Sequence, residues 1–174
     1  MRVILRASGV WIEGERLKSK MNAGEMEALA GGLAGRTNDI PMHPSGTRRQ
    51  NVSTSGMVWY IDYPEDRSSH FLLALSPQDT PGCPDTAFSG SIELNGKVLS
   101  TDLTERTFPR DGEVRVRGHH RMWSCDVGTH KVFFVFEPRR NAMGKHSGVP
   151  RLAYVSIIFG SASEPNAAAN GDSG

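Results

Sequence analysis

Two apolar runs near the C-terminus constrain the fold of this chain more than any other feature. Residues 132–136 read Val-Phe-Phe-Val-Phe, and residues 152–159 read Leu-Ala-Tyr-Val-Ser-Ile-Ile-Phe. Both runs are short and rich in β-branched and aromatic residues, which favours strand over helix, and apolar residues on both faces are typical of strands covered on two sides. Residues 137–151 between them carry several cations and one carboxylate, Glu137. The sequence therefore predicts a buried β-hairpin with a long basic loop at its tip.

Several further strands are predicted along the chain, at residues 3–12, 57–63, 69–75, 90–94, 97–100 and 113–117. Residues typical of turns separate them, and Asn95-Gly96 between two strand-like runs is the strongest local hairpin signal. Asn22, with Glu25 three residues later, predicts the start of a short helix. These elements predict an all-β fold, a single antiparallel β-sandwich that is jelly-roll-like, with one short N-terminal helix and a disordered C-terminal tail.

The length of 174 residues favours one domain. We expect residues 1–56 to hold the N-terminal strand, the helix and a flexible arm, because residues 37–55 are rich in Pro, Gly, Ser and Asn and have no apolar period. Residues 57–160 would form the β-sandwich core. Residues 161–174 are small and polar, which predicts disorder.

The net charge of +1 conceals an asymmetry along the chain. Residues 1–104 carry 10 Lys and Arg against 12 Asp and Glu, whereas residues 105–151 carry 10 against 5, and residues 152–174 carry none against 2. Such charges often do no more than solvate exposed strands, but here they alternate with histidines that can add to the positive charge. Positive charge is thus concentrated in one part of the β region.

No motif of an enzyme stands out, so we predict a non-enzymatic protein without a cofactor. The serines lack the strand-turn-helix setting of a nucleophile, the neighbouring carboxylates lie in predicted turns, and no glycine-rich loop has the spacing of a phosphate-binding loop. The N-terminal apolar run is too short for a signal peptide, and no stretch approaches the roughly 20 apolar residues of a membrane helix. Two cysteines make no disulfide framework, which favours a reducing compartment.

A zinc site is a minority hypothesis, because thiolate and imidazole are the ligands that zinc prefers. The residues that could contribute are Cys83, His119, His120, Cys125 and His130. Their spacing matches no recognised ligand pattern, so the favoured interpretation is a free thiol near exposed histidines.

The remaining candidate site is a group of basic residues in and near the predicted strand 113–117. In the predicted strand 113–117, alternation places Val114 and Val116 inward and Arg115 and Arg117 on one outer face. With Arg106, Arg110 and the hairpin loop, this row could follow the phosphates of a single strand, and Trp123 or Tyr154 could stack on bases if exposed. Burial in the core is the alternative for both, and it is favoured for Tyr154 because its neighbours are all apolar. The predicted nucleic-acid-binding residues are Arg115, Arg117, Arg121, Arg139, Arg140, Lys145 and Arg151.

The order of elements over residues 69–160 resembles the core of the plant-virus movement-protein superfamily, and most closely its small tombusvirus-type members. The points of likeness are the runs 70–75, 89–94, 113–117, 129–137 and 152–160. The family usually has an Asp after the strand that corresponds to residues 92–94, where this chain has Asn95. The resemblance implies a non-enzymatic protein that binds single-stranded viral RNA. It also implies association with host membranes and plasmodesmal proteins at cell junctions, and a role in carrying a viral genome between cells.

Two other functions stay open. One is a protein-binding β-sandwich, such as a viral shell-like subunit that self-associates or an immunity-type inhibitor that recognises an acidic protein surface. The other is a zinc-dependent hydrolase built on the Cys and His residues named above.

Overall fold

The computed structural model describes residues 1–32, 35–42, 45–77, 84–140 and 146–160, and within them the chain forms an all-β sandwich with one short helix. The smaller sheet has the strand order β3-β2-β1-β8-β9, and the larger has the order β10-β11-β12-β13-β7-β6-β5-β4. The strands are β1 (Arg2–Arg6), β2 (Gly9–Ile12), β3 (Glu15–Arg16), β4 (Arg36–Pro41), β5 (Thr47–Val52), β6 (Met57–Tyr63), β7 (Arg67–Ala74), β8 (Ser91–Leu94), β9 (Lys97–Val98), β10 (Arg117–His119), β11 (Met122–Val127), β12 (His130–Arg140) and β13 (His146–Ile158). The predicted all-β sandwich is confirmed.

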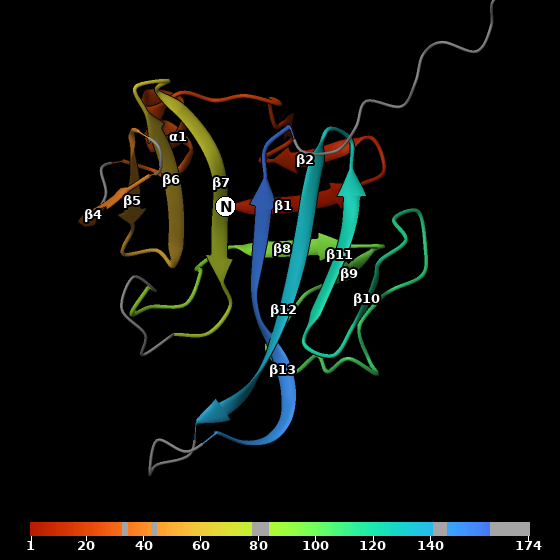
Figure 1. Ribbon diagram of the computed structural model, residues 1–174. Helices are drawn as coiled ribbons and strands as arrows, with labels where there is room; N and C mark the ends of the chain where they lie inside the picture. The colour runs from red at the N-terminus through yellow and green to blue at the C-terminus, as the bar shows by residue number, and fades with distance from the viewer. Residues whose placement is uncertain (33–34, 43–44, 78–83, 141–145, 161–174) are drawn as a thin grey trace, which may run out of the picture.

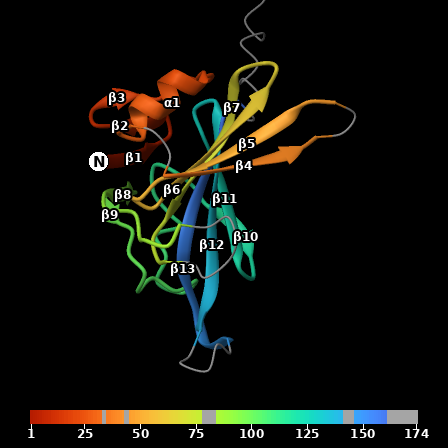
Figure 2. The same ribbon diagram turned by 90° about the vertical axis from the view of Figure 1, so that its left-hand side faces the viewer.

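Antiparallel pairing dominates both sheets, and the pair β1 and β8 is parallel. The larger sheet consists of two meanders, β4 to β7 and β10 to β13, which join where β13 pairs antiparallel with β7. In Figure 1 the larger sheet lies in front of the smaller one, and Figure 2 shows the two layers from the side, with α1 (Ala23–Leu29) on the side of the smaller sheet.

One hydrophobic core fills the space between the layers and draws on residues from both ends of the chain. A row across five strands of the larger sheet shows why these sequences form this layer: Trp123, Phe134, Val155, Leu73 and Met57 are register neighbours and all are buried. Shortening a fully buried aromatic such as Phe134 to alanine typically costs about 3–5 kcal/mol. Because this core includes residues on both sides of residue 56, the predicted division between residues 1–56 and 57–160 does not coincide with a boundary of the core.

Local signals placed the helix and one hairpin correctly. The Asn22 side chain accepts a hydrogen bond from the Glu25 backbone, and Glu25 accepts one from the Asn22 backbone, which completes a capping box. Asn95 and Gly96 both have positive φ and connect β8 to β9, as the hairpin signal predicted.

Four expectations are wrong. Residues 37–55 do not form an arm, because β4 and β5 extend the larger sheet there. The run 3–12 is a hairpin of two strands. The segment 113–117 is not a strand, although Val114 and Val116 are buried, and β10 begins at its last residue. The predicted loop 137–151 is largely strand, since β12 and β13 pair as far as Arg140 and His146.

Two other predictions fall outside the described residues. They are the disordered tail at 161–174 and the position of Lys145 in the hairpin loop.

Candidate functional site

The predicted basic residues Arg115, Arg117 and Arg121 gather at the β10 edge of the larger sheet, and all three are exposed. β10 is only three residues long and pairs with β11, with Arg117 opposite Ser124. Gly118 makes this close pairing feasible, because a Cβ atom there would overlap the backbone of Met122. Arg115 lies just before the strand, so it does not continue the row that alternation predicted.

Arg151 lies on β13, which β11 and β12 separate from β10, and its charge is paired with a carboxylate. Its guanidinium is 3.0 Å from a carboxylate oxygen of Asp102, and its backbone forms an isolated bridge with Thr104. The backbones of Arg139 and Arg140 end β12, while their side chains and Lys145 lie outside what the structure describes. The structure thus brings three of the seven predicted binding residues together as exposed cations that form no ion pair with another described residue.

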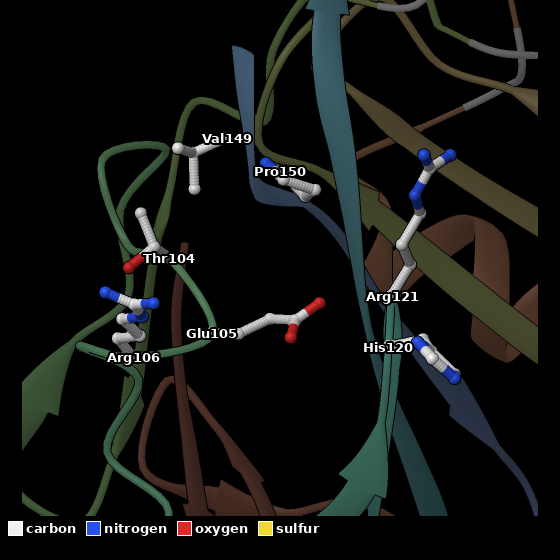
Figure 3. A pocket seen from close by; sticks show the side chains of 7 residues that line it. All are labelled: Thr104, Glu105, Arg106, His120, Arg121, Val149 and Pro150. Carbon is white, nitrogen blue, oxygen red and sulfur yellow. The ribbon is translucent and has the colours of Figure 1, made fainter.

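A cavity of about 630 Å³ lies beside this edge, between the loop that follows β9 and the turn from β10 to β11. Figure 3 shows one wall made by Thr104, Glu105 and Arg106 and the other by His120 and Arg121, with the carboxylate of Glu105 pointing into the space between them. The remaining lining residues are Val149 and Pro150, which come from β13.

Arg106 and Arg121 belong to the basic region predicted from the sequence, but no local pattern indicated that Glu105, Val149 and Pro150 lie beside them. The signal that connects them is the backbone pairing of residue 104 with residue 151, which local patterns do not reveal.

Basic residues form ion pairs more often in residues 1–104 than in residues 105–151. Of the ten Lys and Arg in residues 1–104, five form ion pairs: Arg2, Lys18, Arg36, Arg48 and Arg49. Seven Lys and Arg in residues 105–151 have described side chains, and of these only Arg151 forms one. Because unpaired guanidinium groups keep their full attraction for anions, the β10 side has the greater capacity to bind an anionic partner.

The aromatic residues offered for base stacking face in opposite directions. Trp123 is 9% exposed and belongs to the core, and the guanidinium of the exposed residue Arg110 lies 4.9 Å from its ring centre. Stacking of a base on Trp123 is therefore excluded in this conformation. Tyr154 is half-buried on the outer face of the larger sheet, so the expectation that it belongs to the core is wrong.

The described residues of the zinc hypothesis do not form one cluster, because His119 and His120 contact each other but Cys125 and His130 lie elsewhere on β11 and β12. Cys125 is buried, and burial raises the pKa of its thiol to about 12, which keeps it protonated. His130 is buried near the other end of β11 from His119 and His120, with its Nε2 atom 3.0 Å from the carbonyl oxygen of Lys18. Burial lowers the pKa of His130. Within the described part of the chain no three metal-ligating side chains cluster, and Cys83 lies outside it.

Comparison with protein-family models, curated proteins and solved structures gave no match for this chain. In the described ranges, no helix has the length and apolar character needed to cross a membrane.

Proposed function

We propose that this chain is a non-enzymatic binding protein that holds single-stranded nucleic acid along the β10 edge. The observation that carries the proposal is a group of exposed arginines that form no ion pair within the described part of the chain: Arg115, Arg117 and Arg121 at this edge, and Arg106 across the cavity from Arg121. Phosphate neutralisation by such residues supplies most of the affinity of non-specific nucleic-acid binding.

The cavity beside the arginines favours a single strand over a duplex. Its volume of about 630 Å³ can admit a splayed base, and Val149 and Pro150 offer an apolar wall, while Arg106 and Arg121 lie where flanking phosphates would be held. A base-paired duplex would keep its bases away from this space.

The experiment is a titration of a short labelled single-stranded oligonucleotide at low salt, followed by fluorescence anisotropy. Replacing Arg106, Arg117 and Arg121 with glutamine should raise Kd by about tenfold or more, because each removed cation loses a phosphate contact. The matched control replaces Arg16, Lys20 and Arg67 with glutamine, which removes the same charge from exposed positions near α1. The control should bind nearly as well as the wild type, and equal losses in both variants would contradict a local site.

Transport of a viral genome between cells is the role that the family resemblance implies, and it is the finer part of the proposal. Expression of a fluorescent fusion in single plant epidermal cells tests it. Signal in neighbouring cells is expected for the wild type, and confinement of the signal to the expressing cell would contradict this role.

A protein-binding β-sandwich is the second candidate, and two exposed apolar side chains favour it. Met122 is 56% exposed and Val149 is 67% exposed, and both lie close to Arg121. Apolar residues beside arginines are typical of protein interfaces. Replacing Met122, which does not line the cavity, with serine distinguishes the candidates, because it should leave the affinity for the oligonucleotide unchanged but weaken binding to a protein.

A further inference from the structure

The outer face of the larger sheet carries apolar side chains that no described element covers. Phe133 and Val135 of β12 and Ile158 of β13 point outward and are half-buried, and Leu72 of β7 continues the surface. Figures 1 and 2 show that α1 and the smaller sheet lie on the opposite side. The sequence-based prediction that both faces of this hairpin are covered is therefore wrong for the described part of the isolated chain.

Strand β12 presents a charge pattern on this face that is complementary to itself. The outward residues are Lys131, Phe133, Val135 and Glu137, and they alternate with the buried residues between them. Phe134 lies midway, so opposite charges stand at equal distances from the centre of the strand. Turning the strand end over end places its lysine where its glutamate was.

Both charges remain without an ion pair among the described residues. The ammonium group of Lys131 lies 5.9 Å from the ring centre of Phe133, although Asp126 is its register neighbour on β11. Glu137 is opposite Arg151 in the register, but the guanidinium of Arg151 is paired with Asp102. Within the described part of the chain, therefore, no ion pair competes with an opposite charge on another molecule.

We propose that this face binds a second copy of the chain, with the two β12 strands stacked face to face and antiparallel. The two-fold axis would run across the strands above Phe134, so that Lys131 of each copy meets Glu137 of the other. Six residues of strand span about 20 Å, and stacked sheets lie about 10 Å apart. The usual offset of about 30° between stacked sheets moves each end by only about 5 Å, which long charged side chains can span.

The same symmetry accounts for the rest of the face. Phe133 of one copy meets Val135 of the other, which buries the apolar centre and gives a closed pair with an isologous interface. In this pair, Asp126 of one copy would lie opposite the turn between β10 and β11 of the other copy, which carries His120 and Arg121. Both β10 edges lie on the same side of such a pair. The proposal does not depend on nucleic-acid binding.

Sedimentation velocity over a range of protein concentrations tests the proposal directly. The wild type should shift from monomer to a closed dimer as concentration rises, without larger species. A monomer at every concentration would overturn the proposal, whatever the variants show.

Charge-reversal variants then test the pairing itself. Lys131→Glu alone and Glu137→Lys alone should each be monomeric, because each creates like charges at both ends of the interface. An equimolar mixture of the two variants should recover the dimer, since every contact is again between opposite charges, and so should the double variant. A dimer that persists in both single variants, or a mixture that remains monomeric although both variants keep the wild-type melting temperature, would overturn the assigned contacts.

Discussion

Asn95 holds Val114 through two hydrogen bonds of opposite direction: its side-chain oxygen accepts from the Val114 backbone N–H at 2.9 Å, and its side-chain nitrogen donates to the Val114 carbonyl at 2.8 Å. The same nitrogen donates to the carbonyl of Pro109 at 3.1 Å. One turn residue therefore fixes the loop that leads into β10 and its arginines. This loop pairs with none of the described strands, so the amide of Asn95 substitutes for backbone pairing.

We predict that Asn95→Asp destabilises the protein by about 1–3 kcal/mol. A carboxylate keeps the acceptor and tolerates the positive φ of this position, but it cannot donate to the carbonyls of Val114 and Pro109. Chemical denaturation measures the change. Asp111→Asn, at an exposed position in the same loop, is the control and should leave the free energy of unfolding nearly unchanged. Equal stability of Asn95→Asp and the wild type would contradict the role of the amide.

Two adjacent arginines on β5 form ion pairs with carboxylates that differ in burial, and this gives a second prediction. Arg48 pairs with Asp62, whose side chain is 10% exposed, whereas Arg49 pairs with Asp39, whose side chain is 52% exposed. Arg48→Met should cost about 1–3 kcal/mol, because it leaves a buried carboxylate without its partner, and some access of water keeps the cost from being larger.

Arg49→Met is the matched control for this pair. It removes the same charge from the next residue, but its carboxylate partner is open to water, so the effect on the denaturation midpoint should be much smaller. Similar destabilisation by the two substitutions would show that burial of Asp62 does not distinguish them.

His70 predicts how stability depends on pH. Burial lowers its pKa to about 4, and the charge of Arg48 acts in the same direction, while the ring stacks on Tyr60 at 4.0 Å. The unfolded chain binds a proton at this site as the pH falls through about 6.5, but the folded chain does so only near pH 4. Stability from this site is therefore complete above pH 6.5, decreases between about 6.5 and 4, and then levels off.

His70→Phe tests this prediction because it retains a ring against Tyr60 and removes the titrating group. The free energy of unfolding should fall more steeply between pH 6.5 and 4 in the wild type than in the variant, by an amount on the order of 3 kcal/mol. Parallel pH profiles for the two proteins would refute the assignment.

The buried thiol of Cys125 should react with thiol reagents only after unfolding. Burial raises its pKa to about 12, so almost no thiolate is present near neutral pH. Labelling kinetics are best measured in a Cys83→Ser variant, which leaves one thiol. Labelling at the rate of global unfolding is expected, and rapid labelling of the folded protein would show that the site opens to solvent.

Sequence alone predicted the parts of the fold that short-range signals control. Asn22 with Glu25 and Asn95 with Gly96 act within a few residues, so the helix start and the hairpin followed from local chemistry. β4 and β5 were missed because their residues have no apolar period. Asn51 of β5 is buried through pairing with β6, a contact that polar composition conceals.

Of the candidate site, the sequence predicted the positive charge but not the arrangement of the residues. Arg117 and Arg121 stood out because the basic residues cluster in the sequence, but the neutralisation of Arg151 by Asp102 required loops distant in sequence to meet. The cavity beside Glu105 likewise forms where segments distant in sequence meet. Likewise, alternation along β12 gave the strand, but only the layer arrangement showed that one of its faces has no cover within the described chain.

The salt dependence of oligonucleotide binding tests the central claim most directly. Binding through several phosphates predicts that log Kd rises linearly and steeply with log salt concentration for the wild type. Replacing Arg106, Arg117 and Arg121 with glutamine should reduce this slope by about 2, because each single-strand phosphate contact contributes about 0.7. No affinity at low salt, or the same slope in both proteins, would contradict the assignment of the β10 edge as a nucleic-acid-binding surface.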